Sequence, residues 1–504
     1  MWKLEVFSGL FSNAFVLVIS FLLCLLILDF VKSRNKHPRF PPGPAGLPFL
    51  GNILQIDFRN LHIALTQLSK KFGGVYSLHF FRKKIVVLNS FEVLKDALIN
   101  RSEDIADRPR FPLSEKLGYE GESKGLLLIR YGDAWKEQRR FALSTMRNFG
   151  MGKKSLEERV TEEAHCLCAV FKSHAGLPFD AWYLINNAVS NVICALAFGD
   201  RFDYEDKRFQ RLLHLFDDSL RAASGFLGQL LNEMPWLLKV PGLADHVLKP
   251  QYQLTAFLKE ILIEHQKSFN SGDIRDFIDA YLLEMEKVKG TGDTIFTENN
   301  LFTIVFDLFG AGTETTSTTL RWALLYMILY PDIQSKVHEE IDRVIGRGRS
   351  PTMADIQEMP YTYAVIHEIQ RCGDISPMTL PHMTYRDMEI QEYFIPKGIT
   401  IFINLSSVLK DEQVWEKPHQ FYPKHFLDDN GKFVKREAFI PFSAGRRVCL
   451  GEKLARMELF LFFTILLQQF TFEIPSKQPR PRDDPIYAFT LSPHPYQMCA
   501  VPRV

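Results

Sequence analysis

The feature that most constrains the fold is a long stretch in the middle of the chain, LFTIVFDLFGAGTETTSTTLRWALLYMILYP, from Leu301 to Pro331. Thr297 precedes it and is a residue type that caps helices, and Pro331 predicts where the helix ends. A helix between these points is roughly 50 Å long at 1.5 Å per residue, which is long enough to cross a whole domain. We therefore expect a mainly helical fold built around one central helix.

Short runs rich in β-branched residues predict small sheets beside the helices. KKIVVLN (Lys83 to Asn89) and ITIFINL (Ile399 to Leu405) are both flanked by turn residues, as strands usually are. No internal repeat or Ser/Gly linker interrupts the chain beyond residue 40. The predicted fold class is therefore mainly α with small β-sheets.

The amino-terminal stretch VFSGLFSNAFVLVISFLLCLLIL, residues 6–28, contains no charge and is long enough to span a bilayer as a helix. Basic residues follow it between positions 32 and 39, which predicts a cytosolic location for the rest of the chain. The alternative is a cleaved signal peptide, but a basic segment before the run and a small-residue cleavage site after it are absent. We expect a membrane anchor (1–30), a basic and proline-rich connector (31–52) and one domain (53–504).

Composition excludes several classes of function. The formal net charge of +1 offers no basic excess for binding nucleic acid. The seven cysteines include no CxxC pair, so neither a disulfide framework nor a zinc ribbon is indicated. GMGKKS (Gly150 to Ser155) lacks the first glycine and the Ser/Thr of a phosphate-binding loop. The chain therefore has no recognisable nucleotide site of its own.

One cysteine stands in a distinctive pattern, F-x-x-G-x-R-x-C-x-G, within FSAGRRVCLG. Glycines let a flat ligand approach the backbone, and Arg447 can pair with a carboxylate at the edge of such a ligand. Cys449 lies just before the amino end of a predicted amphipathic helix, where free N–H groups and the helix dipole favour a thiolate. This pattern predicts a soft metal ligand; a buried cysteine in a glycine-rich turn is the alternative.

Glycines and threonines interrupt the central helix at GAGTETTSTT. They are poor residues for a helix interior, and such a local contradiction points to function. We expect Gly312 to permit a distorted turn with room for a small molecule, Thr315 to bond dioxygen or water, and Glu314 to deliver protons. The alternative is a set of threonines packed at a helix crossing.

Asp307 stands in an apolar part of the same helix, and spacings of four align it with Ala311 and Thr315 on one face. A buried carboxylate needs a partner. Two interpretations remain open: Asp307 accepts hydrogen bonds from nearby backbone and braces a pocket, or it is the counter-ion of a protonated amine substrate.

Together these motifs resemble the cytochrome P-450 superfamily of haem-thiolate monooxygenases. FSAGRRVCLG is similar to its haem-binding loop, AGTETT to its A-G-x-[DE]-T-T motif, and WKEQR to its W-x-x-x-R motif. Glu368 and Arg371 match its E-x-x-R motif, with His425 of FYPKHF where many members have arginine. The chain as a whole resembles microsomal family-two enzymes of the D subfamily, although Ala223 stands where that group often has a second acid.

The resemblance implies haem b ligated by Cys449, with Thr315 and Glu314 as catalytic residues. The remaining haem contacts that it implies are Arg108, Trp135, Arg139, Ala311, His382, Phe442, Ser443 and Arg447. The residues that it implies for the substrate are Leu127, Leu220, Phe226, Asp307, Leu380 and Phe489. A structural network of Glu368, Arg371 and His425 completes the set.

By the same resemblance, the protein is expected to hydroxylate or dealkylate lipophilic small molecules, among them xenobiotics, basic amines or endogenous lipids and steroids, as an unspecific monooxygenase. Dioxygen is a co-substrate, and electrons come from NADPH through a flavoprotein reductase, with cytochrome b5 as a further partner. The expected location is the endoplasmic reticulum membrane. The reductase is expected to bind a basic face formed by Arg139, Arg446, Lys453 and Arg456. The Trp-bearing segment 233–243 is expected to contact the membrane. A haem-thiolate isomerase of lipid peroxides and a non-catalytic membrane haem protein remain alternatives.

Overall fold

The computed structural model describes residues 20–21, 24, 37–81, 83–116, 125–151, 153–290, 294–487 and 490–503. These fall into two compact units: a smaller one, Met1–Ala106 with Leu380–Asn404, and a larger one, Asp107–Thr379 with Leu405–Val504. Nearly all of the predicted anchor lies outside the described residues. Within the described ranges, the structure contains no helix both apolar enough and long enough to cross a membrane.

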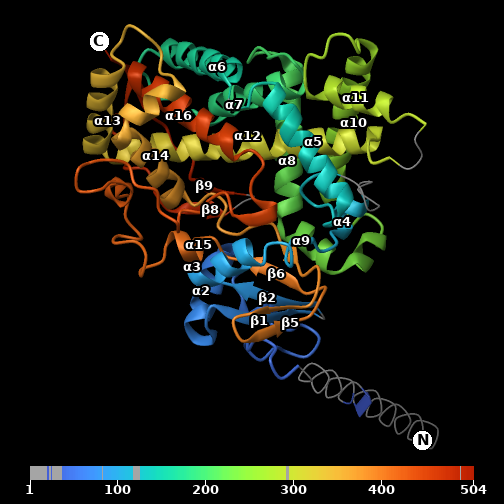
Figure 1. Ribbon diagram of the computed structural model, residues 1–504. Helices are drawn as coiled ribbons and strands as arrows, with labels where there is room; N and C mark the ends of the chain where they lie inside the picture. The colour runs from blue at the N-terminus through green and yellow to red at the C-terminus, as the bar shows by residue number, and fades with distance from the viewer. Residues whose placement is uncertain are drawn as a thin grey trace, which may run out of the picture. The chain divides into compact units, whose positions relative to one another are not determined.

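The smaller unit is a four-stranded sheet with short helices (Figure 1). Its strand order is β1-β2-β6-β3, in which β2 runs antiparallel to β1 and parallel to β6. Both predicted strands are confirmed, because they form β2 and β6. The elements of this unit are η1 (Ile53–Gln55), η2 (Phe58–Asn60), α2 (Leu61–Phe72), β1 (Val75–Phe80), β2 (Lys83–Leu88), α3 (Phe91–Lys95), η3 (Asp96–Asn100), β3 (His382–Met383), β4 (Met388–Ile390), β5 (Tyr393–Ile395) and β6 (Thr400–Ile403).

The larger unit is mainly helical. Its helices and 3-10 turns before the central helix are α4 (Pro112–Lys116), α5 (Asp133–Asn148), α6 (Lys154–Ser173), α7 (Trp182–Ala197), α8 (Lys207–Ser224), α9 (Phe226–Glu233), η4 (Pro235–Lys239), α10 (Asp245–Lys267) and α11 (Phe277–Lys287). The elements that follow are α12 (Glu298–Leu329), α13 (Pro331–Val344), η5 (Met353–Glu358), α14 (Pro360–Gly373), α15 (Ser406–Leu409), η6 (Pro423–Phe426), η7 (Gly445–Arg447), α16 (Glu452–Gln469) and strands β7 (Phe470–Glu473), β8 (Pro485–Tyr487), β9 (Leu491–Pro493) and β10 (Cys499–Pro502). The strands pair as two antiparallel ribbons, β10 with β7 and β8 with β9.

The predicted central helix is confirmed as α12. The side chain of Thr297 accepts a hydrogen bond from the Asn300 amide and caps the helix, and the helix ends at Leu329, shortly before Pro331. Its 32 residues correspond to about 48 Å. Figure 1 shows α12 running through the larger unit, where it contacts α7, α10, α14 and α16. Most of its side chains are buried, so α12 is the centre of the core.

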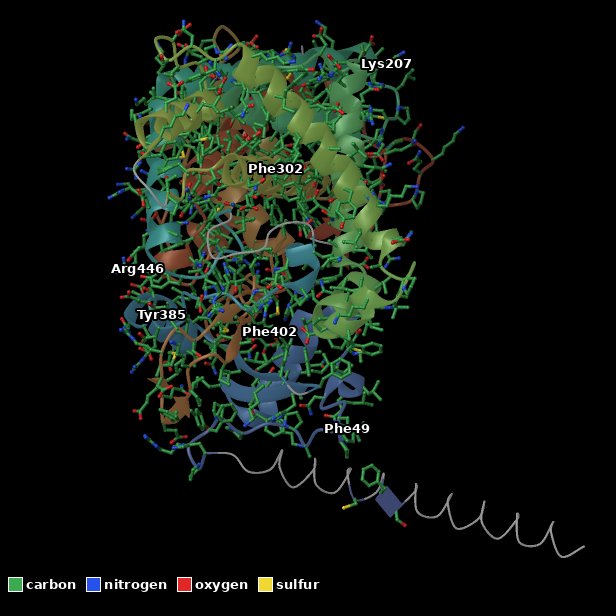
Figure 2. The ribbon with its side chains drawn as sticks, turned by 90° about the vertical axis from the view of Figure 1, so that its right-hand side faces the viewer. Phe49, Lys207, Phe302, Tyr385, Phe402 and Arg446 are labelled. Atoms are coloured by element: carbon green, nitrogen blue, oxygen red, sulfur yellow. The ribbon has the colours of Figure 1, made fainter. Side chains whose placement is uncertain are left out.

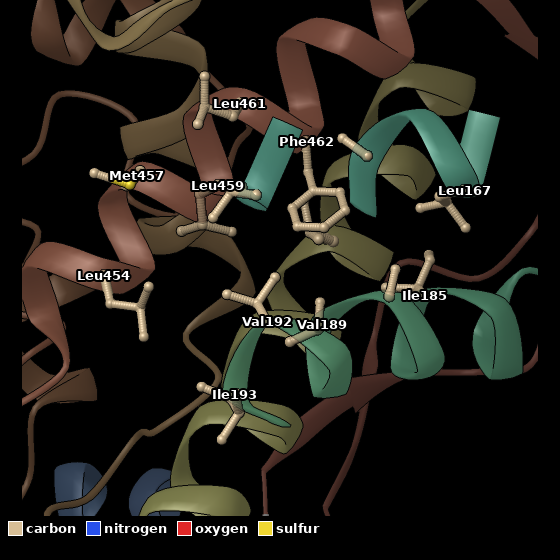
Figure 3. Packing of buried hydrophobic residues seen from close by; sticks show 14 of the residues in the cluster. Leu167, Ile185, Val189, Val192, Ile193, Leu454, Met457, Leu459, Leu461 and Phe462 are labelled. Carbon is tan, nitrogen blue, oxygen red and sulfur yellow. The ribbon is translucent and has the colours of Figure 1, made fainter. Parts of the chain in front are cut away.

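The core around α12 is formed by apolar side chains from several helices. Figure 3 shows Val189 and Val192 of α7 close to Leu459 and Phe462 of α16. Helix α16 buries its side chains almost without interruption from Leu454 onward. The predicted helix after the cysteine loop is therefore confirmed, and it packs against the same central helix as α7.

Candidate active site

The loop that carries Cys449 folds back on itself before α16 begins. The amide of Cys449 donates to the carbonyl of Phe442 at 3.0 Å, which closes the loop around η7. Ser443 and Gly445 have φ values of 60° and 76°, a region that residues other than glycine rarely adopt. The strained turn therefore places the thiol beside the first turn of α16.

Cys449 is exposed, although the protein atoms around it desolvate its thiol. Burial raises the pKa of this thiol, while the amides of Gly451 and Glu452 and the guanidinium of Arg139 lower it. The amides at the start of α16 thus favour the thiolate as expected, while desolvation by the surrounding protein opposes them. A bound metal cation, which deprotonates a coordinating thiol outright, accounts for a thiolate here.

Two arginines lie over the ring of Trp135, which is buried on α5. The guanidinium carbon is 4.2 Å from the ring centroid for Arg447 and 5.5 Å for Arg139. Arg139 Nη2 also donates to the carbonyl of Val448 at 2.6 Å. Helix α5 is thereby joined to the Cys449 loop, and three of the predicted haem contacts lie together.

A third guanidinium, that of Arg108, belongs to the same cluster. Its Nε donates to the carbonyl of Leu127 at 3.0 Å. Burial lowers the pKa of Arg108 to about 10, and burial together with repulsion from Arg108 lowers the pKa of Arg447 to about 8. Asp107 partly offsets this repulsion and is itself held by Arg130 at 2.6 Å. Arg108 is buried, and Arg139 and Arg447 are half-buried. Crowded cations of this kind favour an anionic ligand, and a carboxylate suits the guanidinium geometry.

Helix α12 presents an accessible stretch in its otherwise buried middle. Ala311 is exposed and Thr315 is half-buried, whereas Gly310 and Thr313 are buried. The hydroxyl of Thr315 donates to the carbonyl of Ala311 at 2.7 Å. Thr315 thus stands on the accessible side of the helix and retains its oxygen lone pairs for another donor.

The glycines of α12 have a packing role that the sequence analysis missed. A Cβ atom at Gly310 would lie 2.3 Å from Phe216 Cζ, and one at Gly312 would lie 2.4 Å from Ile193 Cδ1. The helix continues through Gly312 without a break. The structure shows no break at Gly312 to match the predicted distorted turn, and the contact that it shows for this glycine is the close approach of Ile193 on α7.

Glu314 points toward the β8–β9 ribbon. Its Oε1 accepts hydrogen bonds from the hydroxyls of Thr490 at 2.8 Å and Thr318 at 3.3 Å. Burial raises the pKa of Glu314, and these hydroxyls only partly counter the shift. The acid is therefore protonated more readily than an exposed glutamate. No pattern around Thr490 in the sequence indicated that it would meet α12.

Asp307 binds the backbone that precedes α5. Its Oδ2 accepts the amide of Leu126 at 2.7 Å and that of Leu127 at 3.1 Å. Gly125, at φ 79°, passes so close that an added Cβ would lie 2.7 Å from the same oxygen. Burial raises the pKa of Asp307 to about 6, although the two amides lower it. These contacts correspond to the bracing interpretation.

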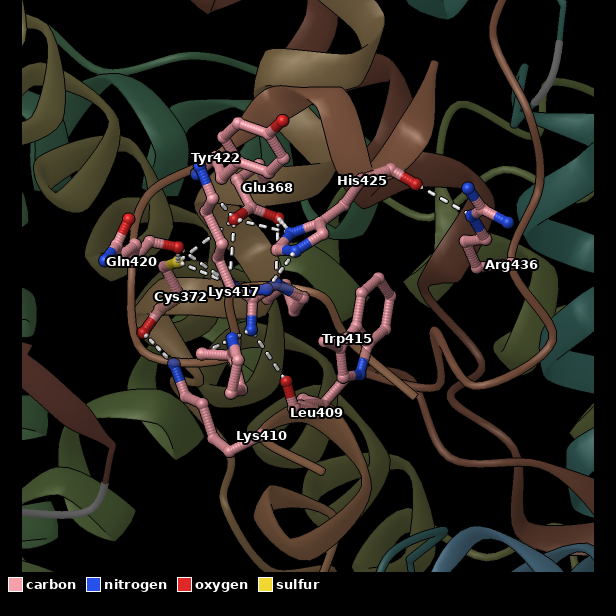
Figure 4. A network of polar contacts seen from close by, with 12 residues as sticks. Glu368, Cys372, Leu409, Lys410, Trp415, Lys417, Gln420, Tyr422, His425 and Arg436 are labelled. Atoms are coloured by element: carbon pink, nitrogen blue, oxygen red, sulfur yellow. Dashed lines mark hydrogen bonds and ion pairs between the residues drawn. The ribbon is translucent and has the colours of Figure 1, made fainter. Parts of the chain in front are cut away.

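The Glu368 network is shown in Figure 4. Arg371 donates to both carboxylate oxygens of Glu368, at 2.8 and 2.7 Å, and both side chains are fully buried. His425 Nδ1 lies 3.1 Å from Glu368 Oε1. Its Nε2 accepts the Lys417 amide at 3.1 Å, so Nδ1 carries the proton in the neutral ring and donates to the glutamate. The network thus includes His425 as a donor, and the amide of Tyr422 joins it at 2.8 Å.

The other predicted residues lie in several places. Leu220 is half-buried on α8 and packs against the main core. His382 and Leu380 belong to the smaller unit, where His382 Nδ1 lies 2.8 Å from the carbonyl of Ile105. The structure does not describe the side chain of Phe226, and Phe489 lies outside the described residues.

Comparison with known proteins supports the same class. The family model "Cytochrome P450" matches residues 41–500, so the chain belongs to the cytochrome P450 family. It is 54% identical over 481 residues to cytochrome P450 2D6 of Homo sapiens, which covers 95% of this chain and 97% of that protein. It is 53% identical to cytochrome P450 2D14 of Bos taurus over 489 residues (97% and 98%) and 52% identical to cytochrome P450 2D4 of Rattus norvegicus over 505 residues (100% and 98%).

The chain is therefore a haem-thiolate monooxygenase of the family-two, D-subfamily type. It uses haem b, dioxygen and electrons that come from NADPH through a reductase, and its substrates are lipophilic small molecules. The isomerase alternative is not favoured. The residues described above fit a haem, because the exposed Cys449 lies in a loop that is bonded to a cluster of buried and half-buried arginines. In the same loop the buried Oγ of Ser443 has no hydrogen-bond partner within the described residues.

Proposed function

We propose that the Cys449 loop and the arginine cluster hold the haem. Cys449 is the iron ligand, and when bound the haem supplies the oxygen-activating chemistry. The residues assigned to its carboxylates are Arg108, Trp135, Arg139, His382 and Arg447, and those assigned to its ring are Ala311, Phe442 and Ser443. The observation that carries the proposal is the approach of Arg139 and Arg447 to Trp135, together with the hydrogen bond from Arg139 to the cysteine loop.

Thr315 and Glu314 manage protons in this proposal. The Thr315 hydroxyl is fixed by the Ala311 carbonyl on the accessible side of α12, where it can accept a hydrogen bond from water. Burial raises the pKa of Glu314, so this acid can hold a proton, while its Oε1 accepts hydrogen bonds from the Thr490 and Thr318 hydroxyls. The two residues are neighbours in the sequence and lie about 100° apart around the helix axis, with the threonine orienting water and the glutamate supplying protons.

The substrate site selects its ligands by apolar contact and therefore accepts lipophilic molecules of many different structures. The residues that line the substrate site are Leu127, Leu220, Phe226, Leu380 and Phe489, all of them apolar. Asp307 positions Leu127 through its hydrogen bonds to the backbone, so it shapes the site as a brace. We therefore expect basic amines and neutral lipophiles of similar size to be substrates alike.

The protein is attached to the endoplasmic reticulum membrane by residues 1–30, with its catalytic domain in the cytosol. The described residues support a lipid contact in each unit considered by itself. In the smaller unit Leu54 is 71% exposed, and Phe49, labelled in Figure 2, is also exposed. In the larger unit Trp236 of η4 is 58% exposed. Exposed aromatic and aliphatic side chains of this kind favour a membrane interface.

The reductase, and cytochrome b5 as a second partner, bind near the cysteine loop. Arg446, labelled in Figure 2, and Lys453 are exposed on either side of Cys449. Arg456 is instead bound to Glu452 at 2.9 Å. Arg446 and Lys453 are therefore the cations offered to an acidic partner.

Reconstitution with reductase tests the proposal. The full chain in lipid vesicles with an NADPH-dependent flavoprotein reductase should consume NADPH and oxidise both members of a size-matched pair, one amine and one neutral lipophile. Arg446→Glu with Lys453→Glu should slow NADPH consumption and leave haem content unchanged, and Lys172→Glu, at an exposed lysine of α6, serves as a surface control. Rearrangement of lipid peroxides without reductase, in place of NADPH-dependent oxidation, would contradict the proposal.

A further inference from the structure

His265 and two aspartates form a cluster that the proposed function does not use. His265 lies in the last turn of α10, whereas Asp276 caps α11 and Asp279 lies in the first turn of α11. His265 Nε2 is 2.9 Å from Asp276 Oδ2 and 3.0 Å from Asp279 Oδ1. The aspartates are buried and the histidine is nearly so. The cluster therefore joins the ends of two helices that pack against each other (Figure 1).

In each aspartate one carboxylate oxygen is already bound by the protein, and the other faces His265. Asp276 Oδ1 accepts the amide of Asp279 at 2.9 Å. Asp279 Oδ2 accepts the amide of Arg275 at 3.1 Å and the Nε of the same arginine at 2.7 Å. Outer partners of this kind fix the orientation of carboxylates in metal sites. The two oxygens that face His265 are therefore placed as ligands are.

The facing oxygen of Asp276 lacks a hydrogen bond. Asp276 is 1% exposed, and its Oδ2 has no hydrogen-bond partner among the described residues. Its contact with His265 is an ion pair only when the ring is protonated. Gly199, at φ 83°, approaches the same oxygen so closely that an added Cβ would lie 2.9 Å from it. A buried carboxylate oxygen without a donor is costly, so a group that satisfies it is expected.

A metal cation is the group that matches all three side chains. Burial lowers the pKa of His265, but Asp276 and Asp279 raise it by more, so the surroundings favour positive charge on this ring. A single N–H at Nε2 can serve only one of the two facing oxygens well, whereas a metal ion binds both oxygens and the nitrogen together. The three ligand atoms all lie within 4.8 Å of one another. One imidazole nitrogen and two carboxylate oxygens suit Zn²⁺, while Ca²⁺ and Mg²⁺ prefer oxygen ligands alone.

The guanidinium of Arg275 lies at the edge of the cluster. Its Nη2 is 3.3 Å from His265 Nε2 and 3.0 Å from Asp279 Oδ1. The arginine side chain is 38% exposed, so it can turn toward solvent when an ion enters. The backbone amide of Arg275 still holds Asp279 Oδ2 after that movement. This edge therefore gives the ion its path from solvent and leaves room for a water ligand.

We propose that His265 Nε2, Asp276 Oδ2 and Asp279 Oδ1 bind Zn²⁺, with water as the fourth ligand of a tetrahedral site. The ion joins the end of α10 to the start of α11 and holds the connecting segment 268–275. Because α10 also packs against α8 and α12, the ion stabilises the larger unit. The site uses none of the residues assigned to the haem or the substrate, so it does not depend on the proposed function.

Zinc binding to the haem-loaded full chain tests the site. After dialysis against a chelator, the wild type should bind one equivalent of Zn²⁺ per chain in a calorimetric titration with zinc chloride. The ion should raise the unfolding midpoint, and chelator should reverse the rise. Asp276→Asn can still accept the Asp279 amide but loses the facing oxygen, so it should fold and bind zinc at least about tenfold more weakly. His265→Gln should weaken zinc binding in the same way.

Two variants are controls. Asp206→Asn changes the aspartate that caps α8 through the amides of Arg208 and Phe209, and it should bind zinc as the wild type does. His494→Gln changes a more exposed pair, in which His494 Nε2 lies 3.4 Å from Asp484 Oδ2, and it should also leave zinc binding unchanged. A wild-type midpoint that zinc does not raise, or full zinc binding in D276N or H265Q, would overturn the proposal. These measurements need no turnover, so a failure of the monooxygenase assay would not affect them.

Discussion

Asp307 Oδ2 lies 2.7 Å from the amide nitrogen of Leu126 and anchors that segment to the central helix. The two residues are 181 positions apart in the sequence. The same oxygen holds the next amide, that of Leu127, so one carboxylate fixes a backbone turn against α12. Because Arg108 in turn donates to the Leu127 carbonyl, this turn also contacts the arginine cluster.

Asp307→Asn should remove a pH-dependent loss of stability. The pKa of Asp307 is about 6 against an ordinary 3.8, so between these values the native protein binds more protons than the unfolded chain. Stability therefore falls as pH rises through this window, by up to about 3 kcal/mol. D307N, whose amide oxygen can still accept both backbone amides, should equal or exceed the wild-type unfolding midpoint at pH 8 and show less change from pH 4 to 6. Asp307→Ala leaves the two amides unpaired, so it should be less stable than the wild type from pH 4 to 6 and at pH 8. A stable D307A would contradict the bracing role.

The same substitution tests the amine interpretation. If Asp307 is a brace, D307N should change the affinities for a cationic amine and a size-matched neutral lipophile by similar factors, measured by spectral titration of the haem. A charge-assisted hydrogen bond contributes about 1.5 to 3 kcal/mol, which is about a tenfold to hundredfold effect. A loss of that size for the amine alone would show that Asp307 is a counter-ion.

Cys449→Ala should abolish the thiolate signature of the haem. Because Cys449 is exposed and its loop is joined to Arg139 through the Val448 carbonyl, the reduced wild-type protein with carbon monoxide should show the red-shifted Soret band of cysteine-ligated iron. C449A should lack this band while keeping a folded core by circular dichroism. Cys499→Ala, on strand β10, is the control and should keep it. A thiolate band in C449A would disprove the ligand assignment.

Thr315→Ala should uncouple turnover without loss of haem or substrate binding. The hydroxyl stands on the accessible side of α12, so its loss should divert NADPH to peroxide or water and lower the coupled fraction by about 10-fold or more. Thr319→Ala is a matched control, since its hydroxyl also donates to the carbonyl four residues earlier, at 2.8 Å, but it is buried. Coupling should be normal in T319A, and equal uncoupling in both variants would point to helix packing instead.

Arg371→Lys should be severely destabilising despite the retained charge. Arg371 satisfies Glu368 and the carbonyls of Leu409 and Pro418 at once, and an ammonium group cannot reproduce this fork. Breaking a buried pair of this kind costs about 3 to 5 kcal/mol. R371K should therefore be inactivated at a lower temperature and should retain less haem. Arg482→Lys, at an exposed pair with Asp484, should change both properties little. Normal haem retention in R371K would contradict the structural role of the network.

The local sequence was sufficient to predict those features of the fold that depend only on neighbouring residues. The cap at Thr297, the limit at Pro331 and the strands β2 and β6 follow from residue types within a few positions, and all are present. The loop around Cys449 could be recognised because the spacing of its glycine, arginine and cysteine residues resembles the haem-binding loop of the family. These features depend on backbone preferences and short-range hydrogen bonds, which the chain carries wherever it folds.

What the tertiary structure decided is burial and the identity of distant partners. The sequence by itself determined a central helix with Asp307, Gly312 and Thr315 on it, but not that Asp307 binds the Leu126 amide or that Gly312 makes room for Ile193. The pKa of Cys449 likewise depends on distant atoms, since the amides at the start of α16 lower it while desolvation by the rest of the protein raises it. Desolvation and packing depend on atoms from segments far apart in the chain, so they arise only once those segments are folded together.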